Sequence, residues 1–133
     1  NLKQGDGRVI SNFIIQALKN KNITIYGKGT QTRSFCYVTD LIDGLVKMMG
    51  TNKNFIGPIN LGNPFEIKII NLARLIVKLS NSKSKIVFKK LPGDDPKRRN
   101  PDISLAKKHL SWKPNVSIND GLLSTIKYFK NLN

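Results

Sequence analysis

The sequence predicts an α/β fold with about five helices and a small sheet of three or four short strands. Apolar residues recur with the helical period of 3.6 residues over residues 8–19, 69–79 and 118–132, which indicates amphipathic helices. Short β-prone runs around Ile25 and Val87 lie between these helical segments. Strands separated by helices in this way are typical of α/β proteins.

The predicted elements alternate along the chain. Helices are expected over residues 8–19, 40–49, 69–79, 103–110 and 118–132, and strands around residues 23–25, 34–38, 59–61 and 85–89. The expected N-caps are Asp6, Thr39, Asp102 and Ser117, the last in a capping box with Asp120. Asp40 and Asp43 complement the dipole of the second helix, and Gly50 ends it. Because Lys68 stands where the third helix needs a cap, its first turn is expected to fray.

Composition bounds the class of protein. The 133 residues, 39% of them apolar, are enough for one domain with a core. The chain begins without Met in a polar turn, so we expect it to be a piece of a longer protein. The single Cys36 has no disulfide partner and is expected to be a small buried hydrophobe, and the single His109 is expected on the surface. No metal site is predicted.

The charge of the chain is strongly positive, with 23 Lys and Arg against 8 Asp and Glu and a net charge of +15. The lysines are spread along the whole chain, without a ladder of aromatic residues between them. Such a pattern raises non-specific affinity for polyanions through counterion release but reads no base sequence. We therefore expect no specific nucleic-acid partner, while a basic nucleic-acid-binding module stays open as an alternative.

The loop after the first strand contains the residues best suited to bind a ligand. Gly27 and Gly29 tolerate positive φ angles and a close approach to the main chain. Gln31 offers an amide that suits a sugar hydroxyl, and Arg33 offers the planar fork of donors that suits a phosphate. An ordinary turn followed by a solvated arginine is the alternative.

Motifs spread over nearly the whole chain resemble the C-terminal part of extended short-chain dehydrogenases/reductases that act on nucleotide sugars. The resemblance is strongest to the UDP-glucuronate decarboxylase family. The motifs are Asp6-Gly7-Arg8-Val9, Tyr26-Gly27 through Gln31-Thr32-Arg33, Asn60-Leu61-Gly62-Asn63-Pro64, Asp94-Asp95-Pro96 followed by Arg99-Asn100-Pro101-Asp102, and Trp112-Lys113-Pro114. The resemblance implies a Rossmann-type protein in which residues 1–133 are the nucleotide-sugar-binding part, and the NAD-binding part precedes them.

The resemblance also implies which residues contact the substrate. They are Arg8, Val9, Phe13, Tyr26, Gln31, Arg33 and Arg99. Val9 would lie near the base, Gln31 near the ribose, and the two guanidiniums of Arg33 and Arg99 on the diphosphate. The implied reaction converts UDP-glucuronate to UDP-xylose and CO2 through an NAD-dependent 4-keto intermediate.

Two motifs of the family are missing from this sequence. The glycine-rich fingerprint Gly-x-x-Gly-x-x-Gly, which seats the NAD pyrophosphate, does not occur. The catalytic Tyr-x-x-x-Lys is also absent, because Tyr26, Tyr37 and Tyr128 are followed four residues later by Thr30, Leu41 and Leu132. We therefore assign no catalytic and no cofactor-binding residue to the chain and expect it to be inactive alone.

Several alternatives remain open at the level of sequence. Another nucleotide-sugar dehydratase or epimerase of the same superfamily, or a non-catalytic binding module, would share many of these motifs. The resemblance further implies a homodimer for the full-length protein. Members of the family are found in the cytosol and in the Golgi, so the resemblance does not choose a compartment.

Overall fold

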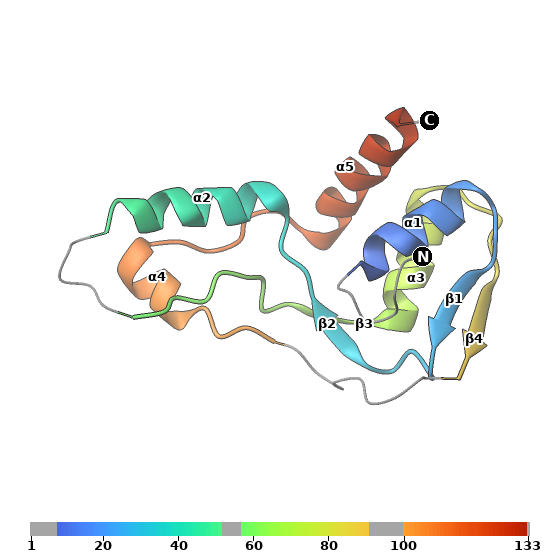
Figure 1. Cartoon of the computed structure of the whole chain (residues 1–133), viewed down its shortest axis with the longest axis horizontal. Coiled ribbons are helices and arrows are strands. Elements are labelled where there is room, and N and C mark those ends of the chain that lie inside the picture. Colours follow the sequence, from blue (N-terminus) through green and yellow to red (C-terminus); the bar gives the residue numbers. More distant parts are fainter. Residues whose placement is uncertain (1–7, 52–56, 91–99, 133) are drawn as a thin grey trace. The chain divides into compact units, whose positions relative to one another are not determined.

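The computed structural model describes residues 8–51, 57–90 and 100–132 (Figure 1). Its elements are α1 (Val9–Leu18), β1 (Ile23–Tyr26), β2 (Thr32–Ser34), α2 (Val38–Met49), β3 (Glu66–Lys68), α3 (Ile69–Leu79), β4 (Ile86–Lys89), α4 (Ser104–Leu110) and α5 (Ile118–Asn131). The α/β class and the five helices are confirmed for this part of the chain. The strands form two sheets of two strands each, β1 with β4 and β2 with β3, where the sequence suggested one small sheet.

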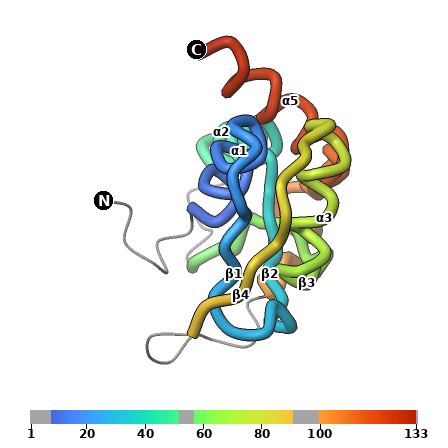
Figure 2. The backbone as a smooth tube through the Cα atoms, turned by 90° about the vertical axis from the view of Figure 1, so that its right-hand side faces the viewer, coloured from blue at the N-terminus to red at the C-terminus, as the bar shows by residue number. Residues whose placement is uncertain are grey.

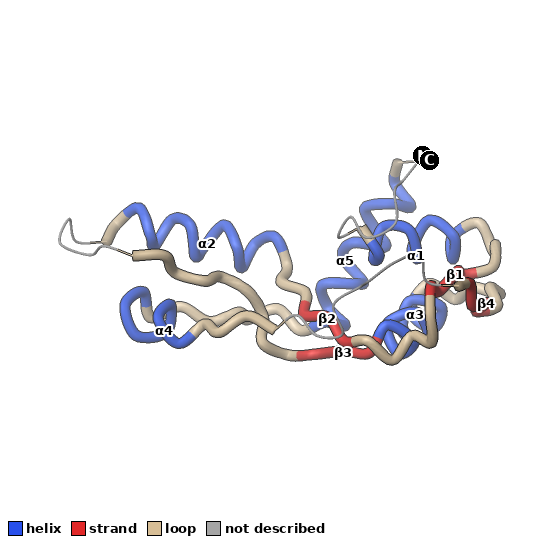
Figure 3. The backbone as a smooth tube through the Cα atoms, turned by 60° about the horizontal axis from the view of Figure 1, so that its bottom comes forward, coloured by secondary structure: helices blue, strands red, loops and turns tan. Residues whose placement is uncertain are grey.

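The chain divides into two compact units. The first unit consists of Asn1–Thr32, Ile67–Arg98 and Leu122–Asn133, and the second unit consists of Arg33–Glu66 and Arg99–Gly121. Three of the four boundaries between them fall within β2, β3 and α5, which are labelled in Figure 3, and the fourth, between Arg98 and Arg99, lies outside the described residues. Each unit is therefore built from segments that are distant in sequence.

The first unit is organised around the parallel pair of β1 and β4, which run side by side in Figure 2 with Ile23 opposite Ile86 and Tyr26 opposite Lys89. Helix α1 packs against both α3 and β1. The buried side chains come from α1, β1, α3 and α5, namely Phe13, Ile14, Ala17, Ile23, Ile25, Ile69, Leu72, Ala73, Ile76, Leu122 and Ile126. Burial of this apolar surface is the main force that holds the short strands in place.

The second unit has its core around Trp112. Ile103, Ala106, Leu110 and Trp112 are buried together, and Cys36, Met48, Ile59 and Leu61 pack against them. Helix α2 approaches this cluster through Gly44, where an added Cβ would lie 2.9 Å from Leu61 Cδ1 and 3.1 Å from Trp112 Nε1. The glycine thus allows the helix to pack closely on the core.

Asp40 joins α2 to the segment after Trp112. Its backbone carbonyl accepts a hydrogen bond from Trp112 Nε1 at 2.9 Å, and its Oδ2 accepts from the backbone N–H groups of Asn115 at 3.1 Å and Val116 at 2.9 Å. The residue is 6% exposed. Asp40 lies in the first turn of α2, as expected from the dipole, but it also holds the Trp-x-Pro segment in place.

Three predicted boundaries and one predicted strand are wrong. The second strand covers 32–34 and not 34–38, and α2 begins at Val38 with Tyr37, not Thr39, at its N-cap position. The chain over 59–61 is not a strand: Ile59 and Leu61 are partly buried and pack against the Trp112 core, but the segment has no ladder partner. Ile103 occupies the N-cap position of α4, one residue after the predicted Asp102.

Other local predictions are confirmed. The bounds of α3 agree with the apolar period, Gly50 occupies the C-cap position of α2, and Ser117 Oγ accepts a hydrogen bond from the Asp120 N–H at 3.1 Å. Asp102 still serves α4, since its Oδ1 accepts from the Ser104 N–H at 2.9 Å. The predicted cap Asp6 lies outside the described residues.

Candidate functional site

The glycine loop, residues 27–31, lies between β1 and β2 in the first unit. Gly27 has a φ of +83° and Gly29 a φ of +73°. The predicted positive φ angles at both glycines are confirmed. These are conformations in which a residue with a Cβ is strained.

Backbone hydrogen bonds hold the loop against the rest of the first unit. The Gly27 N–H donates to the carbonyl of Lys89 at 2.8 Å, at the end of β4. The N–H groups of Ile69 and Ile70 donate to the carbonyls of Gln31 and Gly29, each at 3.0 Å. The loop is thus anchored to β4 on one side and to the first turn of α3 on the other.

The contact with α3 explains how this helix begins without a capping side chain. No side-chain hydrogen bond caps it at Lys68, as the sequence predicts. Two of its first N–H groups instead donate to carbonyls of the glycine loop, so the missing cap is no longer a reason to expect that the first turn frays. The loop and the helix start therefore form one structural feature.

Gly29 is buried against this helix start. A Cβ at position 29 would lie 3.0 Å from Ile70 Cβ, 3.3 Å from the Ile70 backbone nitrogen and 3.3 Å from Ile25 Cγ2. The close backbone approach that the sequence suggested for a ligand is made here by α3. Gly29 is therefore explained by packing, and any ligand would contact other atoms of the loop.

Gln31 and Tyr26 lie at opposite ends of the loop and contact each other. Gln31 Nε2 donates a long hydrogen bond of 3.4 Å to the backbone carbonyl of Tyr26. Both residues are half-buried. This contact holds the amide of Gln31 at the end of β1, and two other residues of the loop, Lys28 and Thr30, are exposed.

The predicted contacts on α1 differ in exposure. Arg8 occupies the N-cap position of the helix and is exposed, and Val9 is half-buried. Phe13 is 3% exposed and belongs to the core of the first unit. Its burial follows from packing alone, whereas Arg8 and Val9 leave surface for a ligand to contact.

Of the two arginines expected to bind a diphosphate, only Arg33 lies within the residues that the structure describes. Arg33 lies in β2, is half-buried and belongs to the second unit. Arg99 lies outside the described residues. Whether the two guanidiniums meet at one ligand stays a prediction.

The described residues provide neither a metal site nor an activated cysteine nucleophile. They contain no group of three or more His, Cys, Asp and Glu residues placed to hold a metal ion. Burial, with a smaller contribution from the charge of Asp40, raises the pKa of the Cys36 thiol, which donates to the Tyr37 carbonyl at 3.7 Å. A raised pKa disfavours the nucleophilic thiolate, so Cys36 is a packing residue, although it is only partly buried.

Sequence reasoning missed the loop carbonyls of Gly29 and Gln31 as partners of α3 and missed Asp40 as a buried acceptor. The absence of a cap at Lys68 was the available signal for the first, because a helix start without a cap needs another source of acceptors. No local pattern distinguishes Asp40 from Asp43, which instead forms an exposed ion pair with Lys47 at 3.4 Å.

Comparisons with known proteins agree on one family. Residues 1–62 match the model of the NAD dependent epimerase/dehydratase family. The chain is 50% identical over 129 residues to UDP-glucuronic acid decarboxylase 1 of Xenopus tropicalis, a match that covers 97% of this chain and 30% of that protein. It is 49% identical over 117 residues to UDP-glucuronic acid decarboxylase 3 of Arabidopsis thaliana, which covers 88% of this chain and 34% of that protein.

A solved structure agrees in fold. The UDP-glucuronic acid 4-epimerase from Bacillus cereus, in complex with UDP-glucuronic acid and NAD, matches with a TM-score of 0.87 and 37% identity, over 94% of this chain and 40% of that chain. The present chain thus spans about a third of the length of the two decarboxylases. None of its described helices is long and apolar enough to cross a membrane. The chain is thus similar over nearly its whole length to one part of each of these proteins, and its residues 1–62 match the NAD dependent epimerase/dehydratase family.

Proposed function

We propose that this chain is the nucleotide-sugar-binding part of a UDP-glucuronate decarboxylase, a lyase that converts UDP-glucuronate to UDP-xylose and CO2. The observation that carries the proposal is the 50% identity to UDP-glucuronic acid decarboxylase 1 of Xenopus tropicalis over 97% of the chain. The anchored glycine loop adds structural support, because it presents Gln31 and exposed loop atoms on a fixed backbone. A fixed backbone lowers the entropy cost of ligand binding.

In this proposal the loop and the start of α1 bind the UDP moiety. Val9 and Tyr26 border the base and Gln31 the ribose, while Phe13 supports Val9 from the core. Arg8, Arg33 and Arg99 supply positive charge to the diphosphate. Charge-assisted hydrogen bonds from a guanidinium fork are stronger than neutral ones and suit adjacent phosphate oxygens.

The residues of this chain do not fit NAD. The sequence contains neither the glycine-rich fingerprint that seats the pyrophosphate nor the Tyr-x-x-x-Lys pair. We therefore assign the cofactor and the catalytic groups to a further part of the polypeptide and derive no chemical step from the present residues. The same reasoning predicts that the chain alone has no decarboxylase activity.

The outer face of α2 supports the presence of such a further part. Five large apolar side chains are 54% to 86% exposed and lie on one stripe of the helix, at Val38, Ile42, Leu45, Val46 and Met49. An exposed apolar stripe of this kind marks an interaction surface. A second domain of the same polypeptide would cover it.

A nucleotide-sugar 4-epimerase is the second candidate. The specific observation in its favour is the match to the UDP-glucuronic acid 4-epimerase from Bacillus cereus. The identity of 37% to that protein is lower than the 50% and 49% to the decarboxylases. Incubation of the full-length protein with UDP-glucuronate separates the two, because only the decarboxylase releases CO2.

Calorimetric titration of the chain with UDP, UDP-glucuronate and dTDP tests the binding site directly. Loss of a charge-assisted contact costs about 1.5–3 kcal/mol, so Arg33→Ala and Arg99→Ala should each weaken UDP binding roughly ten- to hundredfold. Arg74→Ala is the matched control, because it removes an exposed arginine of α3 that lies outside the predicted site. UDP affinity equal in all three variants, in chains with a folded far-ultraviolet spectrum, would contradict the site.

A further inference from the structure

The positive charge of the protein is concentrated in the first unit. Among the described residues this unit carries thirteen basic side chains and no acidic one, whereas the second unit carries five of each. The thirteen, all exposed, are Arg8, Lys19, Lys21, Lys28, Lys68, Arg74, Lys78, Lys83, Lys85, Lys89, Lys90, Lys127 and Lys130. Over its full sequence the first unit has sixteen basic and three acidic residues, and these three, Asp6, Asp94 and Asp95, lie outside the described residues.

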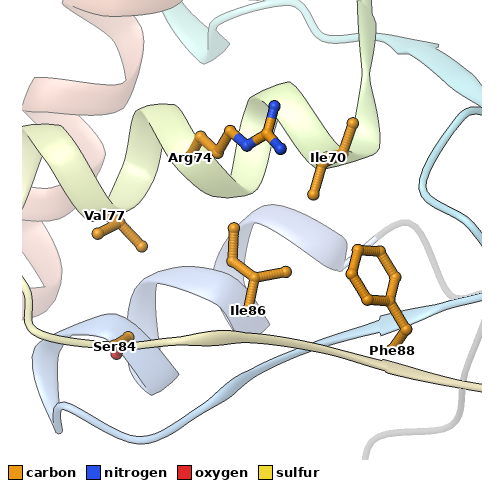
Figure 4. Close-up of a pocket in the computed structure, with 6 residues that line it drawn as sticks. All are labelled: Ile70, Arg74, Val77, Ser84, Ile86 and Phe88. Carbon is orange, nitrogen blue, oxygen red and sulfur yellow. The ribbon is translucent and has the colours of Figure 1, made fainter.

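A groove lies within this charged unit, between α3 and β4 (Figure 4). It is lined by Ile70, Arg74 and Val77 from one stripe of α3. Ile86 and Phe88 line it from alternate positions of β4, and Ser84 lines it from the chain just before this strand. Its volume is about 410 Å3. Phe88 is 54% exposed and Arg74 is exposed, so a ligand in the groove can contact both an apolar surface and a guanidinium.

The topology of the sheet explains why the groove is open. In the described residues β4 pairs only with β1, so β4 is an edge strand. Its backbone groups on the unpaired side can accept another strand. The side chains of Ile86 and Phe88 lie beside this edge and remain partly uncovered by α3.

From the charge and the groove together, we propose that the first unit docks an acidic, extended segment of a partner protein along β4. Aliphatic side chains of the segment fill the space between Ile70, Val77 and Ile86, and its carboxylates meet Arg74 and exposed lysines of the first unit. Addition of a strand to an open sheet edge supplies main-chain hydrogen bonds, while pockets for alternate side chains supply selectivity.

Charge complementarity favours an acidic segment, because no described carboxylate of the first unit offsets its basic residues. The lining favours a peptide over a nucleic acid. Single-stranded nucleic acids stack on successive aromatic side chains, and Phe88 is the one aromatic residue among the six that line the groove. The groove shares no residue with the predicted UDP site, so this proposal is independent of the proposed function.

Fluorescence anisotropy with a labelled peptide tests the proposal. The probe is a peptide of about twelve residues in which Glu alternates with Val, so that all Val side chains project to one face of a strand. A peptide in which Ser replaces Val has the same charge without apolar anchors and serves as the ligand control. We expect the Glu-Val peptide to bind roughly tenfold more tightly than the Glu-Ser peptide.

Variants of the protein test the position of the peptide. Phe88→Ser and Arg74→Ala should each weaken binding of the Glu-Val peptide roughly fivefold or more. Lys130→Ala, which removes an exposed charge from the last turn of α5, should change it by less than about twofold. Arg33→Ala, a variant of the predicted UDP site, should leave peptide binding unchanged.

Three results would overturn the proposal. Equal affinity for the Glu-Val and Glu-Ser peptides would show diffuse electrostatic attraction and no use of the groove. If Arg74→Ala and Lys130→Ala weaken binding of the Glu-Val peptide equally, the attraction is likewise diffuse and does not use the groove. Displacement of the peptide by an oligonucleotide of much higher affinity would assign the charged surface to nucleic acid. Methyl chemical-shift changes confined to Ile70, Val77 and Ile86 would support the groove even if Phe88→Ser impairs folding.

Discussion

Replacement of Gly29 by alanine should destabilise the first unit by about 2–6 kcal/mol. A residue with a Cβ at a φ of +73° costs about 1–3 kcal/mol in backbone strain. The new Cβ would also lie 3.0 Å from Ile70 Cβ and 3.3 Å from the Ile70 nitrogen, a conflict with a stiff helical segment that typically costs about 1–3 kcal/mol. The sum is a large part of the roughly 5–15 kcal/mol by which natural domains are stable.

Urea denaturation followed by far-ultraviolet circular dichroism measures this loss. Gly50→Ala is the matched control, because Gly50 has a φ of −92° and the nearest atom to its added Cβ is the Lys47 carbonyl oxygen at 3.7 Å. That substitution should change the free energy of unfolding by less than about 0.5 kcal/mol. The packing explanation of Gly29 fails if Gly29→Ala unfolds at the same urea concentration as the native chain and loses only UDP affinity, since that result would place a ligand at Gly29.

The remaining predictions concern the second unit. Asp40→Ala removes a buried acceptor from two backbone N–H groups and should lower the free energy of unfolding by about 1–3 kcal/mol, with a smaller loss for Asp40→Asn; equal stability of all three chains would contradict this role. The hydrogen bond from the Ser104 backbone lowers the pKa of Asp102, so its stabilising contribution is present above the ordinary pKa of Asp and is lost as the pH falls through the lower folded value. Stability measured over the acid range should therefore depend less on pH in Asp102→Asn than in the native chain. Burial raises the pKa of Cys36, so the folded chain should react with a thiol reagent near pH 8 more slowly than the urea-unfolded chain, and equal rates would refute the raised value. The same shift makes stability fall as the pH rises from the unfolded to the folded pKa of the thiol.

Local rules predicted the elements whose stability depends on neighbouring residues. The period of Leu72 and Ile76 placed α3 at its observed bounds, and the Ser117 hydroxyl caps α5 as its position before Asp120 suggests. Steric limits on φ are equally local, which is why positive values at Gly27 and Gly29 could be expected. The resemblance supplied the family, which the comparisons confirm, and the predicted substrate contacts remain to be tested.

Predictions failed where a partner distant in sequence decides the local conformation. Ile59 and Leu61 alternate like a strand, yet they pack on the Trp112 core without a ladder partner. Asp40 and Asp43 look equivalent in the first turns of α2, but the segment after Trp112 buries one and leaves the other in an exposed ion pair. No window of neighbouring residues contains this information.

The sequence by itself determined the α/β class, the main helices, the glycine loop and the family, because periodicity, backbone sterics and motif order are properties of the chain alone. The tertiary structure decided what the glycine loop contacts. Its carbonyls complete the uncapped start of α3, and Gly29 makes room for Ile70. The tertiary structure also decided where the positive charge lies. Basic residues are spread along the sequence, but the excess positive charge falls almost wholly in the first unit. Both outcomes depend on which distant segments fold against one another.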